Sequence, residues 1–82
     1  MDIELIYSKY LACGGQVTTD SRTLRGGELF IALKGENFDG NRFVPQALAA
    51  GAAWAVASRD AGLGADPRVI EVEDTYEALK VL

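Results

Sequence analysis

Two continuous apolar runs, each bounded by turn residues, constrain the fold of this chain more than any other feature of its sequence. They cover residues 29–33 and 53–57. A strand with one face in water alternates apolar and polar residues, so runs without alternation indicate strands that are covered on both faces. Shorter strands are expected at residues 16–19 and 68–72. With helical segments between and around them, these strands predict a single small α/β layered domain with a largely parallel or mixed sheet flanked by helices.

Helical spacing of apolar residues predicts a first helix over residues 3–11 and a second over residues 43–50. Phe43 is one of the apolar core positions of the second helix, and Asn41 can serve as its N-cap. Pro45 is best tolerated in a first turn, so the regular part of this helix is expected to begin close to that proline.

A third helix is expected after Asp74, because Asp74 and Glu77 have the spacing of a capping box. Its apolar pattern still runs at Leu82, the last residue of the sequence. A sequence that stops inside an amphipathic pattern without a C-cap is typical of a piece of a longer protein.

Charge and composition exclude several classes of function. The 82 residues carry 12 Asp and Glu against 8 Lys and Arg, a net charge of −4, which is the wrong sign for a protein that binds a nucleic-acid backbone. The chain lacks a basic signal region and any apolar run near the roughly 20 residues that span a bilayer, so we expect a cytoplasmic domain without a membrane partner. With no histidine and one cysteine, Cys13, the chain has no internal disulfide, no zinc-finger site and no catalysis that pairs His with Ser or Cys. We assign no catalytic residue and no metal site.

The loop of residues 35–40 follows a predicted central strand and precedes a helix, which is where ligands bind in parallel α/β sheets. Backbone N–H groups and the helix dipole at such a position favour a negatively charged ligand. Gly35 and Gly40 have the spacing of a phosphate loop, but Asn41 and Arg42 stand where ATP binding needs Lys and then Ser or Thr. The sequence therefore excludes an ATP loop here, and an ordinary loop whose glycines adopt positive φ remains the alternative.

Asp20, Ser21 and Arg22 place a carboxylate, a hydroxyl and a guanidinium side by side after the first predicted strand. Such a set can recognise a polar ring or a phosphate through hydrogen bonds. An Asx-turn in which Asp20 pairs with Arg22 is the structural alternative. Glu36 and Asp39 are a further acidic pair, but one pair without a histidine is weak support for acid–base or metal chemistry.

Taken together, three segments of the sequence resemble the N-terminal domain of the Mur ligase family. Their order and spacing fit the family pattern of an Asp-Ser-Arg triplet, a glycine before Leu-Phe-Ile-Ala, and an Asp-Gly-Asn loop end. The match covers roughly residues 16–60. The segments are Thr18-Thr19-Asp20-Ser21-Arg22, Gly27-Glu28-Leu29-Phe30-Ile31-Ala32-Leu33-Lys34-Gly35 and Phe38-Asp39-Gly40-Asn41-Arg42-Phe43.

This resemblance implies that residues 1–82 are the N-terminal, UDP-binding domain of a three-domain enzyme. In such an enzyme a central domain supplies the ATP phosphate loop with Mg²⁺, and a C-terminal domain holds the incoming amino acid or dipeptide. Carried over to matching positions, Thr19 and Ser21 would contact the uridine, and residues 35–39 would approach the uracil, the ribose or the diphosphate, largely through backbone groups. Arg22 could instead brace Asp20. The implied UDP-site residues are Thr19, Asp20, Ser21, Arg22, Gly35, Glu36, Asn37, Phe38, Asp39, Gly40 and Asn41.

Residues 32–40 resemble most the family members that add D-alanyl-D-alanine to UDP-N-acetylmuramoyl-tripeptide in peptidoglycan synthesis. The members that add one amino acid to UDP-N-acetylmuramoyl-dipeptide share the same triplet and loop and are the alternative, as is a non-catalytic uridine-nucleotide-binding or structural module. The whole enzyme would be an ATP-dependent peptide-bond-forming ligase. The 82 residues alone are expected to be inactive and to bind UDP compounds weakly, because a shallow one-sided site buries little of its ligand.

Overall fold

A computed structural model describes residues 3–35 and 39–80, and in it four parallel strands form one sheet. The strands are β1 (Val17–Thr18), β2 (Leu29–Ile31), β3 (Trp54–Ser58) and β4 (Val69–Val72), and their order in the sheet follows their order in the chain. Thr18 lies opposite Phe30 on β2, which in turn lies opposite Ala55 on β3. The predicted α/β class and the parallel character of the sheet are confirmed.

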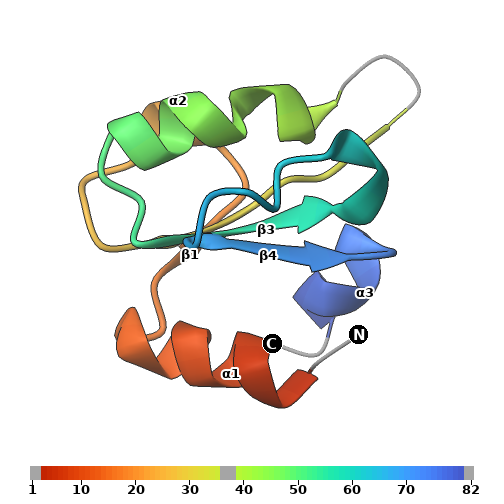
Figure 1. The fold of residues 1–82 in the computed structure, drawn as a ribbon. Helices are drawn as coiled ribbons and strands as arrows, with labels where there is room; N and C mark the ends of the chain where they lie inside the picture. Colours follow the sequence, from red (N-terminus) through yellow and green to blue (C-terminus); the bar gives the residue numbers. More distant parts are fainter. Residues whose placement is uncertain (1–2, 36–38, 81–82) are drawn as a thin grey trace.

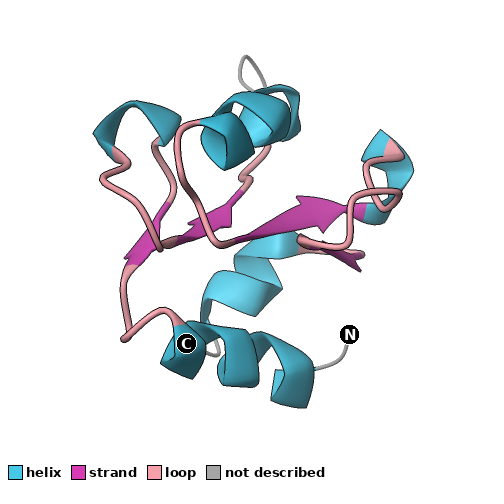
Figure 2. Cartoon of the chain, turned by 60° about the vertical axis from the view of Figure 1, so that its left-hand side comes forward, coloured by secondary structure: helices cyan, strands magenta, loops and turns pink. Residues whose placement is uncertain are grey.

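Helices cover both faces of the sheet (Figure 1). The helices α1 (Ile3–Ala12) and α3 (Thr75–Lys80) lie on one face, and α2 (Val44–Ala49) lies on the other. Because the strands follow one another in a single direction across the sheet, right-handed crossovers all pass over the same face, the face of α2. Figure 2 shows the resulting layers from a second side.

The three crossovers contain short 3₁₀ turns that the sequence patterns did not predict. They are η1 (Ser21–Thr23) between β1 and β2, η2 (Gly40–Phe43) immediately before α2, and η3 (Arg59–Ala61) after β3. Since β1, β2 and β3 are neighbours in that order, α2 lies between η1 and η3 on its face of the sheet.

The central strand β2 is buried on both faces. Leu29 and Ile31 pack with Ile6 of α1 in the core below the sheet, whereas Phe30 packs with Val44 of α2 in the core above it. All five of these side chains are at most 1% exposed. Burying an apolar side chain of this size contributes about 1.5–3 kcal/mol, so the unbroken apolar run of the sequence is explained by a strand that supplies both cores.

The start of α2 differs from the sequence prediction. The helix begins at Val44 with Pro45 in its first turn, as expected, but Asn41 is not its N-cap. Phe43 precedes the helix, and its side chain is 37% exposed instead of lying in the core. Asp39 caps the inserted turn η2, because its carboxylate accepts a hydrogen bond from the Asn41 N–H. The inserted turn therefore moves the polar cap upstream of Asn41 and turns Phe43 outward.

Asp74 caps the start of α3, which confirms its half of the predicted capping box. Asp74 Oδ1 accepts hydrogen bonds from the N–H groups of Tyr76, at 2.9 Å, and Glu77, at 3.4 Å. The predicted continuation of this helix to Leu82 lies outside the described residues.

Candidate functional site

The segment around Ser21 lines a cleft between η1 and the start of α2. We call it the Ser21 cleft. Its volume of about 540 Å³ is in the range of small-molecule sites, ~300–1,000 Å³. It brings together the predicted residues of this segment with two aromatic rings and an amide side chain that the sequence did not single out. The lining residues are Thr19, Asp20, Ser21, Arg22, Phe30, Phe43 and Gln46.

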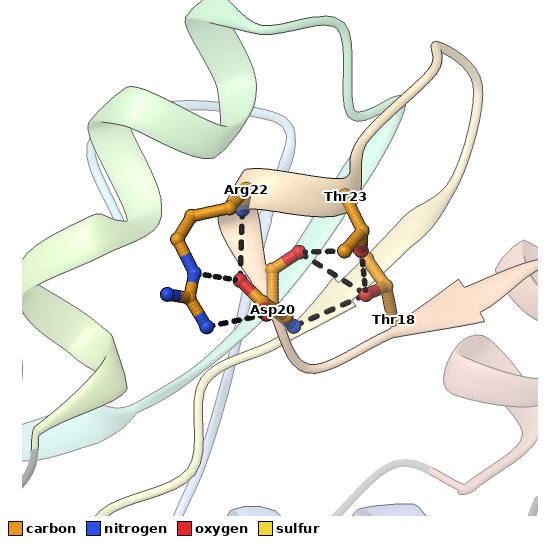
Figure 3. Close-up of polar contacts among 4 residues, drawn as sticks. All are labelled: Thr18, Asp20, Arg22 and Thr23. Carbon is orange, nitrogen blue, oxygen red and sulfur yellow. Dashed lines mark hydrogen bonds and ion pairs between the residues drawn. The ribbon is translucent and has the colours of Figure 1, made fainter.

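Ser21 lines this cleft from a hydrogen-bonded turn, and Figure 3 shows the polar contacts of that turn among Thr18, Asp20, Arg22 and Thr23. The Asp20 N–H donates to Thr18 Oγ1 at 3.1 Å, and the Asp20 carbonyl accepts from the Thr23 hydroxyl at 3.0 Å. The hydroxyl oxygens of Thr18 and Thr23 are themselves 3.1 Å apart. The two threonines were missed by the sequence analysis, although threonine two residues before and three residues after an aspartate is a pattern typical of such turns.

Asp20 and Arg22 form a fork in which the carboxylate accepts from both the backbone and the guanidinium of the arginine. Asp20 Oδ1 accepts from the Arg22 N–H at 2.9 Å and from Nε at 3.0 Å, and Oδ2 accepts from Nη2 at 2.9 Å. The guanidinium hydrogen bond lowers the pKa of Asp20, and the same contact raises the pKa of Arg22. The Asx-turn with Asp20 paired to Arg22, one alternative of the sequence analysis, is therefore confirmed as the geometry of this segment.

The hydroxyls of residues 18–23 divide into two groups. Thr18 and Thr23 use their hydroxyls inside the turn, whereas no hydrogen bond among the described residues uses the hydroxyl of Thr19 or Ser21. A serine or threonine hydroxyl can both donate and accept. Thr19 and Ser21 are therefore available to a ligand in the cleft without breaking the turn.

Asp39 and Asn41 lie in a different cleft, on the other side of the start of α2. This second cleft has a volume of about 280 Å³ and is lined by Asp39, Asn41, Arg42, Pro45, Ala61 and Leu63. The separation follows from the register of the sheet. Strand β1 ends opposite Phe30, and the loop after β2 begins at Lys34, roughly 13 Å further along at about 3.3 Å per residue. The two predicted segments thus share one edge of the sheet, but in the described residues they do not line one cavity.

Asn41 joins the loop to the end of β3. It is 4% exposed, its Oδ1 accepts from the Ser58 N–H at 2.8 Å, and its Nδ2 donates to Asp39 Oδ1 at 2.8 Å and to Ser58 Oγ at 3.3 Å. The Asn41 side-chain amide lowers the pKa of Asp39 by hydrogen bonding to its carboxylate. The structure supports a role for Asn41 in holding the loop, and its contact with a ligand stays a prediction.

The backbone N–H groups at the start of η2 are used within the chain. The Gly40 N–H donates to the Leu33 carbonyl at 2.7 Å, the Asn41 N–H to the Asp39 carboxylate at 3.0 Å, and the Arg42 N–H to the Asp39 carbonyl at 3.2 Å. The expectation that free N–H groups bind an anion here is wrong for these three, because two of them bond to backbone carbonyls and the third to the Asp39 carboxylate. With these three donors used within the chain, and with Asn41 in place of the lysine, residues 40–42 do not fit the phosphates of ATP.

Glycine is needed at position 40 because of close packing and not because of an unusual backbone conformation. A Cβ at this position would lie 2.7 Å from the Leu33 carbonyl oxygen and 2.8 Å from the Leu33 nitrogen. Neither Gly35 nor Gly40 has a positive φ, so the expectation that these glycines supply positive φ is wrong, while an ordinary loop remains the alternative to a ligand site. Gly40 is needed because two segments of backbone approach closely.

The remaining predicted site residues are placed only in part. Gly35 is exposed and lines neither cleft. Glu36, Asn37 and Phe38 lie outside the described residues. Over residues 3–35 and 39–80, the structure has no group of three or more His, Cys, Asp or Glu that could hold a metal ion. In the same ranges, no helix is long and apolar enough to cross a membrane.

Phe43 and Gln46 are site residues that sequence reasoning missed. Both come from the start of α2 and line the Ser21 cleft beside the turn that carries Ser21. A helical pattern alone places Phe43 in the core, so its exposed ring could not be recognised until the turn η2 was known. Phe30 was correctly assigned to the core, where it is 1% exposed, and it is also one of the residues that line the cleft.

Both clefts lie within the part of the chain that matches a known family. The family model described as "Mur ligase family, catalytic domain" matches residues 15–82. The chain belongs to the Mur ligase family. The resemblance seen in the sequence is therefore confirmed at the level of the family.

Among curated relatives, the chain is similar to two kinds of Mur ligase. It is 51% identical over 63 residues to the UDP-N-acetylmuramoyl-tripeptide--D-alanyl-D-alanine ligase of Synechocystis sp., a match that covers 76% of this chain and 14% of that protein. It is 44% identical over 63 residues to the UDP-N-acetylmuramoyl-L-alanyl-D-glutamate--2,6-diaminopimelate ligase of Rickettsia typhi, covering 77% of this chain and 13% of that protein. The chain thus spans about one seventh of the length of these relatives.

Solved structures of Mur ligases share the fold. The MurF ligase from Thermotoga maritima, in complex with ADP, matches with a TM-score of 0.70 and 33% identity over 80% of this chain and 15% of that one. MurF from Acinetobacter baumannii matches with a TM-score of 0.65 and 39% identity over 82% of this chain and 14% of that one.

Proposed function

We propose that this chain is the N-terminal, UDP-binding domain of a ligase that adds D-alanyl-D-alanine to UDP-N-acetylmuramoyl-tripeptide in peptidoglycan synthesis. The relative that is 51% identical carries this activity in its name, and the two solved structures are MurF ligases. The chain covers one seventh of such a protein. The rest of the enzyme, which would act in the cytoplasm, would hold ATP, Mg²⁺ and the D-alanyl-D-alanine.

The Ser21 cleft is the observation that carries the proposal. It combines unused hydroxyls on Thr19 and Ser21 with the exposed aromatic side chain of Phe43. Uracil is a flat ring with carbonyl acceptors and an imide N–H donor, so it can pack against an aromatic side chain while it hydrogen-bonds to hydroxyls. The cleft therefore offers both interactions that recognition of a uridine needs.

The 82 residues are not expected to catalyse ligation. The loop of residues 35–40 does not fit ATP, because its N–H donors at Gly40 and Asn41 already bond within the chain. Activation of the tripeptide carboxylate by ATP is therefore assigned to the remainder of the enzyme.

The purified chain can be tested for uridine-nucleotide binding by NMR. We expect UDP to shift the backbone amide signals of residues 19–23 and 43–46. Ser21→Ala should raise the Kd by about three- to tenfold, the equivalent of one lost hydrogen bond. Ser8→Ala, on the exposed side of α1 and so on the opposite face of the sheet, is the matched control and should leave the Kd unchanged. If millimolar UDP shifts none of these amides, the proposal is wrong.

A second candidate is the ligase that adds diaminopimelate to the UDP-N-acetylmuramoyl dipeptide, because a relative with that name is 44% identical. Both candidates need the same uridine site, so UDP binding does not separate them. Assay of the full-length enzyme does. Ligation of D-alanyl-D-alanine to the tripeptide supports the first candidate, and ligation of diaminopimelate to the dipeptide supports the second.

A further inference from the structure

The Asp-x-Arg fork of the Ser21 cleft occurs a second time in the chain. Asp66 Oδ1 accepts from the Arg68 N–H at 2.8 Å and from Nε at 3.1 Å, and Oδ2 accepts from Nη2 at 2.8 Å. These are the same bonds that join Asp20 to Arg22, within 0.1 Å. The fork is therefore a local structural device, and its presence alone does not indicate a ligand.

The two forks differ in their place in the fold. Arg68 directly precedes β4, so the second fork lies at the amino ends of the strands. The Asp20–Arg22 fork follows β1 and lies at the carboxyl ends, and both of its residues line the Ser21 cleft. Ligands of parallel α/β sheets bind at the carboxyl ends. The Asp20–Arg22 fork alone is thus in a position to meet the proposed ligand.

The fork orients the guanidinium of Arg22 and leaves some of its N–H donors unused. A guanidinium carries five N–H donors in a rigid plane, and Asp20 engages only those on Nε and one on Nη2. The Arg22 side chain remains 84% exposed. Among the described residues that line the Ser21 cleft, Arg22 is the single cation. A planar donor group held in this way suits a phosphate better than a mobile cation does.

We propose that Asp20 is a positioning residue that holds the Arg22 guanidinium at the wall of the Ser21 cleft, where its remaining N–H groups bind the diphosphate of a uridine-diphosphate ligand. The inference rests on the proposed function. Different residues of the cleft then bind different parts of the ligand. Thr19 and Ser21 recognise the uridine, and Arg22 recognises the diphosphate attached to it. The carboxylate of Asp20 offsets much of the arginine's charge, so the gain comes from directed hydrogen bonds.

The test compares uridine with UDP, because the two differ only in the diphosphate. NMR titration of the wild-type chain should give a lower Kd for UDP. Arg22→Ala should reduce this preference at least fivefold and leave the Kd of uridine within twofold of wild type. Asp20→Asn retains an oxygen that can accept the Arg22 backbone N–H, but it replaces one carboxylate oxygen with an amide. It should therefore keep the turn and lose most of the preference for UDP.

Two further measurements separate positioning from a general structural effect. The Asp20→Asn/Arg22→Ala double variant should lose no more preference than Arg22→Ala alone, since both changes remove one interaction. Asp66→Asn makes the matched change in the second fork and should leave both Kd values unchanged. In wild type the Arg22 Nε–H signal should shift with UDP and not with uridine.

The inference is overturned if Asp20→Asn retains the wild-type preference for UDP, whether or not Arg22→Ala loses it. In that case the proposed function still stands, provided that Ser21→Ala weakens binding of both ligands. If the wild-type chain binds neither uridine nor UDP, the proposed function and this inference fail together.

Discussion

At the scale of single residues, Gly40 shows that a glycine can be required by a backbone contact alone. Its N–H bonds to the Leu33 carbonyl, and its Cα faces the same backbone closely enough that a methyl group would meet the Leu33 oxygen and nitrogen at under 3 Å. Gly35 stands in open space with no atom within 4 Å of its hypothetical Cβ. The two glycines of the loop look equivalent in the sequence and differ in the structure.

Gly40→Ala is expected to lower the free energy of unfolding by about 1–3 kcal/mol, the usual cost of forcing an added methyl against fixed atoms. Gly35→Ala is the matched control, and it should change the same quantity by less than about 1 kcal/mol in either direction. Urea unfolding followed by circular dichroism measures both. Equal effects of the two substitutions would contradict the close approach at Gly40.

At the scale of elements, α2 depends on its surroundings. It has six residues, and isolated helices below about 12–15 residues are marginal in water. Its start is held by the turn η2, which is tied to the end of β3 through the buried bond between Asn41 and the Ser58 N–H. That tie keeps Phe43 at the wall of the Ser21 cleft, although Asn41 itself lies in the second cleft.

Asn41→Ala should lower the free energy of unfolding by about 1–3 kcal/mol, because it leaves the buried Ser58 N–H without an acceptor. Ser58→Ala removes only the longer 3.3 Å contact with the Asn41 amide, so its effect on stability through this bond should stay below about 1 kcal/mol. Chemical denaturation compares the two. A larger loss for Ser58→Ala than for Asn41→Ala would be inconsistent with the backbone bond as the main tie.

At the scale of the whole molecule, several of the negatively charged carboxylates accept hydrogen bonds that hold turns of the fold. Asp20, Glu28 and Asp39 each accept backbone N–H bonds, and the pKa of each is lowered by its hydrogen bonds. Asp66 has its pKa lowered to about 2, chiefly by the side-chain hydrogen bond from Arg68. In each case the ionised carboxylate favours the folded state.

Stability should therefore fall in acid. A carboxyl whose pKa is lower in the folded state binds protons first in the unfolded state, so its contribution is complete above its unfolded pKa and is lost as the pH falls through the folded value. For Asp66 this range runs from somewhat above the ordinary 3.8 down to about 2. Urea unfolding at pH 7, 5, 4 and 3 should show a free energy that is nearly constant to pH 5 and then decreases.

Asp66→Asn provides the control for this pH dependence. The variant should be less stable than wild type at pH 7 and show a smaller decrease between pH 5 and pH 3, since one of the linked carboxyls is gone. A wild-type free energy that is the same at pH 3 as at pH 7 would contradict the prediction.

The sequence by itself determined the α/β class, the central strand and the family, and it singled out the segment of residues 19–22 that lines the Ser21 cleft. These follow from local signals: the unbroken apolar run at β2, the turn chemistry of Asp20 and the cap at Asp74 are all readable within a few residues. The sequence also placed Ser21 correctly in a turn. It did not identify Phe43 and Gln46 as residues that line the cleft.

Only the tertiary structure decided how those segments combine. Asn41 is buried and bonded to the end of β3 because the fold brings Ser58, 17 residues away along the chain, next to its side chain. Phe43 is exposed because a 3₁₀ turn precedes the helix and shifts its start. The two predicted segments lie in separate clefts because β1 stops opposite Phe30, whereas the chain after β2 runs on to Lys34, which pairs with Asp39. Register, burial and cavity shape arise from contacts between residues far apart in the chain, which no local pattern encodes.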